Sequence, residues 1–104
     1  IIIELGTPGL ISNVEIDTCH FKGNFPDRAS IQTFDLNHEK DKIKAFEDSS
    51  NWEFFLDEKK CKPDFIHNFG KNDFLHEKTV SHVRLNIYPD GGVSRFRIFG
   101  QPVS

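Results

Sequence analysis

Two runs of alternating apolar and polar residues near the end of the chain constrain its fold more than any other feature. Residues 79–88 read TVSHVRLNIY, and residues 93–99 read VSRFRIF. Side chains two residues apart share one face of a β-strand, so this alternation indicates two strands, each with one buried face. The link at 89–92 is Pro-Asp-Gly-Gly, and its Asp-Gly pair favours a tight turn. We therefore predict an antiparallel hairpin over 79–99.

Similar patterns recur earlier in the chain. Strand-like runs are found at 1–5, 10–21, 29–36 and 52–56. The Gly-Thr-Pro-Gly sequence at 6–9 indicates a turn, and the charged residues at 57–62 indicate a loop. Residues 37–50 are polar, and they fit either one helical turn or a loop. At least five candidate strands without a convincing long helix predict an all-β fold, a sandwich or a jelly roll, with the 11 phenylalanines filling much of its core.

Composition and charge exclude several classes of function. The 104 residues carry a formal net charge of -3, and the basic group of Lys59, Lys60 and Lys62 has acidic neighbours on both sides. We therefore expect no nucleic-acid partner. No apolar run approaches the about 20 residues that a membrane span needs, so we expect no membrane association. The two cysteines, Cys19 and Cys61, form no disulfide framework, which favours a reduced, cytoplasmic location.

The first candidate site lies where the strand-like run at 10–21 enters a loop. Asp17, His20, Lys22 and Asn24 bring together a carboxylate, an imidazole, an ammonium and an amide, and Gly23 lets the backbone approach a ligand closely. Strand ends are places where a rigid scaffold presents functional groups. Such a set suits an amide-rich anion and the transfer of a proton. The alternative is structural: Asp17 and His20 cap the turn while Lys22 is solvated.

The second candidate site lies in the two runs at 79–88 and 93–99. Arg84 and Asn86 are two residues apart on one strand face, so a bidentate cation and an amide point in one direction. Arg95 and Arg97 follow in the next run. A carboxylate ligand suits these groups. The alternative is that Arg84 or Arg97 pairs with a buried acid and holds the two sheets together.

The sequence does not establish a metal site. The five histidines, which are His20, His38, His67, His76 and His82, show neither an HxH nor an HExxH pattern. His20 and His82 lie in the best-defined strand-like runs, from which they could converge with Asp17. The sequence therefore specifies neither a metal nor a cofactor, although a divalent metal is compatible with the residues present.

Two long motifs carry a resemblance to a known family. Residues 14–26, VEIDTCHFKGNFP, resemble the "DT-x-HF-x-GN-(Y/F)-P" segment of allantoicases, and residues 80–100 are similar to their "HVRLNIYPDGG-x-x-R-x-R-x-x-G" segment. The lead-in at 5–9, LGTPG, also fits. The motifs occur in the family's order and cover a third to a half of the chain, whereas residues 37–78 match little. A pair of long, unusual motifs at compatible spacing is a specific signal.

The resemblance implies a fold, an activity and a domain organisation. Allantoicases hydrolyse allantoate to ureidoglycolate and urea, and they carry two copies of a jelly-roll β-sandwich of the galactose-binding, discoidin-like type. Residues 1–104 would be one incomplete domain of this kind that lacks its N-terminal part, and residues 37–78 would be a variable, loop-rich insertion. The strand-like start and the absence of methionine agree with a partial chain. We expect the full-length protein to form homo-oligomers and this fragment alone to be inactive.

The family's reaction suggests roles for the candidate residues. Asp17 and His20 are predicted to act as general acid and base, and Lys22, Asn24, Arg84, Asn86 and Arg95 are predicted to bind the substrate. Arg84 or Arg95 would hold the carboxylate, while Asn24 and Asn86 would bond the ureido groups. Two alternatives stay open: a non-catalytic, galactose-binding-like module that holds a ligand without breaking a bond, and an inactive relative of the allantoicases.

Overall fold

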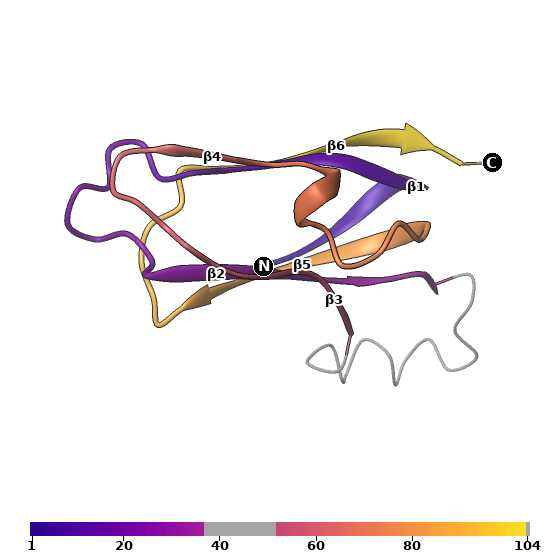
Figure 1. Cartoon of the computed structure of the whole chain (residues 1–104), viewed down its shortest axis with the longest axis horizontal. Coiled ribbons are helices and arrows are strands. Elements are labelled where there is room, and N and C mark those ends of the chain that lie inside the picture. Colours follow the sequence, from indigo (N-terminus) through magenta and orange to yellow (C-terminus); the bar gives the residue numbers. More distant parts are fainter. Residues whose placement is uncertain (37–51, 104) are drawn as a thin grey trace.

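The computed structural model describes residues 1–36 and 52–103, and these residues form an almost entirely β structure (Figure 1). The elements are β1 (Ile2–Asp17), β2 (Arg28–Phe34), β3 (Glu53–Lys60), β4 (Ile66–Phe69), the 3-10 helix η3 (Lys71–Asp73), β5 (Val80–Tyr88) and β6 (Arg95–Pro102). No helix in the described part of the chain has the length and hydropathy to cross a membrane. The predicted all-β, jelly-roll sandwich is confirmed.

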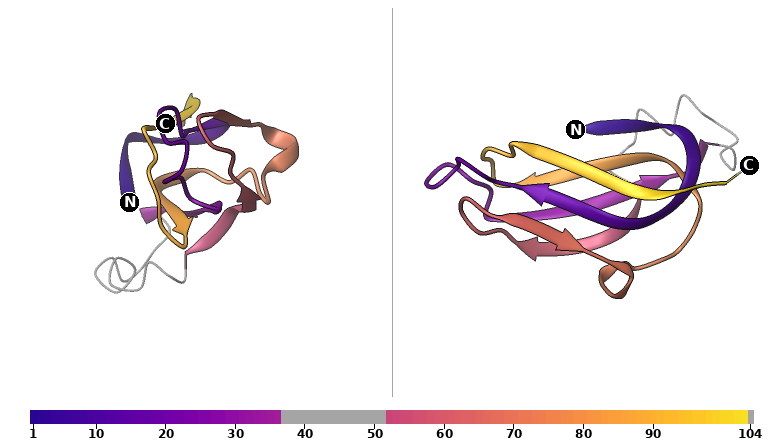
Figure 2. Two further views of the ribbon diagram at one scale, coloured as in Figure 1. Left: turned by 90° about the vertical axis from the view of Figure 1, so that its left-hand side faces the viewer. Right: turned by 90° about the horizontal axis from the view of Figure 1, so that it is seen from above.

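The strands pack as two layers that share β1. One layer has the order β3-β2-β5-β1, and in the other layer β1 lies between β4 and β6. Figures 1 and 2 show β1 leaving one layer and entering the other. Its first residues pair with β5, and the residues from Gly9 to Asp17 pair with β6. The pairing with β5 shifts register between Glu4 and Gly9, and such irregularities let a strand change sheets.

The turn predicted at 6–9 is therefore wrong. Its glycine and proline residues instead form the bend at which β1 changes layers. A Cβ atom at Gly9 would lie 2.6 Å from the carbonyl oxygen of Gln101 in β6, so the absence of a side chain allows the close approach of these two strands.

The core lies between the two layers and follows the predicted alternation. The buried apolar side chains are those of Val14, Ile16, Ala29, Ile31, Phe55, Leu56, Cys61, Val80, Val83 and Leu85. In β5, Val83 and Leu85 face this core, whereas Arg84 and Asn86 lie on the opposite face of the strand. The expectation for the phenylalanines holds only in part, because Phe54, Phe65 and Phe99 are more than two-fifths exposed.

The predicted hairpin is wrong, since its two strands lie in different layers. Strand β5 pairs with β1 and β2, and β6 pairs with β1. The connecting residues bond instead to the loop that follows β1: the Gly92 N–H donates to the Asn24 carbonyl, at 2.8 Å, and the Asp27 N–H donates to the Tyr88 carbonyl, at 2.9 Å. A Cβ atom at Gly91 or Gly92 would clash with 21–26. The two glycines thus permit loop packing rather than a hairpin turn.

The region 37–78, which we expected to be loop-rich, contributes two strands. Residues 37–51 lie outside the described residues, and they include His38 and the whole polar segment 37–50, for which a helical turn or a loop was predicted. Strand β3 pairs with β2 at the edge of one layer, and β4 pairs with β1 in the other. The prediction of a loop at 57–62 is wrong for residues 57–60, because β3 continues through these charged residues as far as Lys60. Charged side chains are typical of an edge strand, where they discourage pairing with another chain.

Candidate functional site

The loops 18–27, 61–65 and 89–94 gather at one end of the sandwich, on the left in Figure 1, and they carry the first predicted cluster. Asp17 ends β1 directly opposite Arg95 of β6. Its Oδ1 accepts the Cys19 N–H at 2.8 Å. Hydrogen bonds from the thiol and backbone of Cys19, with smaller effects of Ser94 and Arg95, hold the pKa of the Asp17 carboxyl below its ordinary value. Asp17 is therefore ionised near neutral pH, which suits a base or a partner for a cation.

His20 is held by its backbone and leaves its ring exposed. Its N–H donates to Oδ1 of Asp64 at 2.8 Å, and its φ of 73° lies in the left-handed region. Asp64 is also left-handed, with a φ of 47°. Non-glycine residues in this region cost about 1–3 kcal/mol each and concentrate at functional sites. The structural alternative for this cluster holds in part, because Asp17 caps the turn through its carboxylate and His20 contributes through its backbone.

Lys22 and Asn24 lie exposed on the same loop. The Asn24 carbonyl accepts the Gly92 N–H, so this loop is tied to the 89–94 connection. The ion-pair alternative applies to Arg97, whose Nε lies 3.5 Å from Oε2 of Glu15 on the neighbouring strand β1. That pair lies within one layer, so it does not hold the two layers together.

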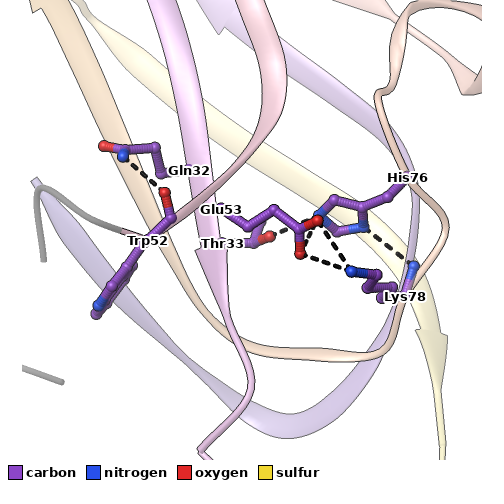
Figure 3. A network of polar contacts seen from close by, with 6 residues as sticks. All are labelled: Gln32, Thr33, Trp52, Glu53, His76 and Lys78. Atoms are coloured by element: carbon purple, nitrogen blue, oxygen red, sulfur yellow. Dashed lines mark hydrogen bonds and ion pairs between the residues drawn. The ribbon is translucent and has the colours of Figure 1, made fainter.

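The second cluster forms a polar network on the outer face of β2 and β5. Nδ2 of Asn86 donates to Oε1 of Gln32 at 3.0 Å and to Oγ of Ser30 at 3.3 Å. Oγ of Ser30 lies 3.0 Å from the Tyr88 hydroxyl. Nε2 of Gln32 donates to the Trp52 carbonyl at 2.8 Å, as Figure 3 shows. Ser30 and Gln32 are buried, whereas Arg84 and Asn86 are half-buried.

Sequence reasoning missed Ser30 and Gln32. The sequence did contain a hint of them, because these two polar residues alternate with core residues in the 29–36 run and lie on the face opposite Ile31. Only the pairing of β2 with β5, which sets Ser30 opposite Asn86 and Gln32 opposite Arg84, reveals their role.

The structure brings the predicted residues together as two groups rather than one. Asp17 and Arg95 face each other at the loop end, and Arg84 and Asn86 share the outer face of β5. The two arginines lie on strands of different layers. A groove of about 250 Å³ is lined mainly by apolar residues of β1 and β6, and none of the proposed residues lines it.

The histidines do not gather around Asp17. His82 is buried on β5, where its ring lies 6.0 Å from that of Phe34 and 6.1 Å from that of Trp52, and its Nδ1 lies 2.8 Å from Oγ of Ser81. Within residues 1–36 and 52–103, no three His, Cys, Asp or Glu side chains are grouped as metal ligands. The convergence of His20, His82 and Asp17 considered from the sequence is thus not seen.

Known proteins match nearly the whole length of this chain. A family model described as "Allantoicase repeat" matches residues 1–103. A probable allantoicase of Rhizobium meliloti (strain 1021) is 43% identical over 103 residues, which are 97% of this chain and 30% of that protein. A probable allantoicase of Acinetobacter baumannii (strain SDF) is 43% identical over 96% of this chain and 29% of its own length.

Two solved allantoicase structures also align with this chain. The crystal structure of allantoicase from Saccharomyces cerevisiae aligns with a TM-score of 0.74 and 31% identity over 96% of this chain and 26% of that chain. Another allantoicase structure aligns with a TM-score of 0.72 and 31% identity, over 95% of this chain and 26% of its own. The chain thus spans about 30% of the length of the curated relatives that it matches. From the family match over 1–103, together with these relatives, it follows that the chain belongs to the allantoicase family.

Proposed function

We propose that the full-length parent of this chain hydrolyses allantoate to ureidoglycolate and urea. Apart from the family, one observation carries this proposal: Arg84 lies on the same strand face as Asn86, whose amide is held by hydrogen bonds. Allantoate bears a carboxylate and two ureido groups on one carbon atom. A guanidinium binds a carboxylate through two parallel hydrogen bonds, and an amide complements a ureido group.

The loop end supplies the groups for proton transfer. We assign Asp17 as the base, because its carboxylate is ionised near neutral pH, and His20 as the acid that assists departure of urea. Lys22, Asn24 and Arg95 are proposed to bind the substrate from the same end. Since the two groups of residues occupy different parts of this chain, we propose that the parent protein completes the site and that the fragment alone is inactive.

Three further properties of the parent protein are proposed, namely its location, its variable region and its oligomeric state. We propose a cytoplasmic protein, which the two unpaired cysteines support. Residues 37–78 are proposed to be the variable part of the repeat. A homo-oligomer is proposed because duplicated sandwiches often associate, and light scattering of the purified parent would measure its mass in solution.

Urea release from allantoate by the full-length parent tests the proposal. Asp17→Asn and His20→Ala should each lower the rate by about 10²–10⁴-fold, the range for lost acid or base catalysis. Arg84→Lys should weaken substrate binding because it removes the bidentate fork. Arg97→Lys, a change of the same kind at an exposed position, is the matched control. Assays with and without a chelator determine whether a metal is needed.

Two outcomes would contradict these assignments. Full activity of Asp17→Asn and His20→Ala would remove both residues from the mechanism. If the folded, intact parent released no urea, the non-catalytic binding module or the inactive relative would become the better description.

A further inference from the structure

The orientation of the Asn86 amide follows from a chain of hydrogen bonds that begins at a backbone carbonyl. The Trp52 carbonyl can only accept, so Gln32 must turn its NH₂ group toward it. The remaining atom of that amide, Oε1, can also only accept, and it faces Asn86 at 3.0 Å. Asn86 must therefore present Nδ2 to Gln32. The oxygen and nitrogen atoms of Asn86 are thus assigned by the network itself.

Ser30 takes up the other hydrogen of the same amide. Nδ2 of Asn86 lies 3.3 Å from Oγ of Ser30, so its two N–H groups have two acceptors. The Ser30 hydroxyl can then donate to the Tyr88 oxygen, 3.0 Å away. A hydroxyl both donates and accepts, so Ser30 would tolerate either orientation of Asn86. Gln32 alone fixes the orientation, and it is only 3% exposed, so its own position is firmly held.

What this network leaves for a ligand is one acceptor and one cation. Within the described residues, no hydrogen bond reaches Oδ1 of Asn86 and no ion pair reaches the Arg84 guanidinium. No buried side-chain oxygen or nitrogen in this part of the chain lacks a partner, so Oδ1 reaches the surface. The two residues are about 6.6 Å apart along one strand face, which one small molecule can span.

We propose that Gln32 is a positioning residue that makes Asn86 a hydrogen-bond acceptor for a ureido N–H, while Arg84 holds the carboxylate of the same molecule. The inference rests on the proposed function, and it specifies the ligand class as a carboxylate with an N–H donor close to it. The Asn86 oxygen discriminates between ligands, because a ligand with a methylene group in place of the N–H leaves this acceptor unpaired.

Two small probes differ at this one group. N-carbamoylglycine has a carboxylate and a ureido N–H, and succinamate has a methylene group in place of that N–H. Calorimetry with the full-length parent should show that N-carbamoylglycine binds about fivefold more tightly, which is what one neutral hydrogen bond contributes. In Gln32→Leu the Asn86 amide is free to turn over, so this preference should disappear while the affinity for succinamate is retained. A residue with only a structural role would change both affinities together.

The control and the decisive outcomes follow from the same titrations. Gln101→Leu makes the same substitution at an exposed position on β6 and should keep the wild-type preference. If Gln32→Leu fails to melt cooperatively, Gln32→Met, which matches the length of glutamine, replaces it. Equal binding of the two probes by the wild type, no binding of either, or an unchanged preference in the Gln32 variant would overturn the inference. Loss of allantoate hydrolysis with the preference intact would instead remove the proposed function alone.

Discussion

Adjacent phenylalanines in β3 offer a test of the fold in which only the strand face differs. Phe55 is 1% exposed, and its ring centroid lies 4.2 Å from that of Phe74 and 5.1 Å from the His76 ring. Phe54 is 43% exposed and faces away from the core. Truncation of a buried phenylalanine costs about 3–5 kcal/mol, because apolar contact is lost and a cavity remains. Phe54→Ala loses about half of the burial and leaves no cavity, so we expect about 1 kcal/mol.

The expected difference of at least about 2 kcal/mol is large for a domain of this size, since total stabilities are about 5–15 kcal/mol. Urea unfolding can be followed by the fluorescence of Trp52, which is the only tryptophan and is 6% exposed. The midpoint for Phe55→Ala should fall much further than that for Phe54→Ala, with similar slopes of free energy against urea. Equal destabilisation by the two substitutions would refute the assigned face of β3, and with it the pairing of β3 with β2.

Three further predictions concern stability. Burial lowers the pKa of His76, whose Nε2 lies 2.9 Å from Oγ1 of Thr33. The imidazole is therefore protonated more readily in the unfolded chain than in the folded one, so the free energy of unfolding should fall as the pH drops below about 6.5. In His76→Gln, which changes the network in Figure 3, the stability should lose this pH dependence, and melting temperatures at pH 5 and pH 8 would show it. Gly92→Ala should lower the melting temperature, because its Cβ atom would clash with the Phe21 ring. Thr18→Val should cost about 1–3 kcal/mol in urea unfolding, since the hydroxyl of buried Thr18 donates to the Lys62 carbonyl and accepts the Phe65 N–H, and both groups would lose this partner. Thr7→Val at an exposed position should be nearly neutral.

The parts of the fold that depend on local periodicity could be predicted, and the parts that depend on distant partners could not. The alternation around Val83 and Leu85 identified β5 and its buried face. The same alternation says nothing about which strand lies beside β5. A Gly-rich link of four residues permits a hairpin, but it also permits a crossing between layers when another loop takes its hydrogen bonds. Here 18–27 takes them, and its pairing with the link joins residues about 65 positions apart.

The candidate site shows the same division between local and distant information. Spacing along one strand placed Arg84 and Asn86 on a common face, because two residues is the repeat of a strand. It could not show that Asn86 offers an oxygen rather than a nitrogen, since that choice is made by Gln32, more than fifty positions away, and by the Trp52 carbonyl. An asparagine that could turn freely would accept or donate with little preference. The chemistry offered to a ligand is therefore set by the register of β2 against β5. A shift of that register by one residue would place an inward-facing neighbour where Gln32 now lies, and the selectivity of Asn86 would be lost.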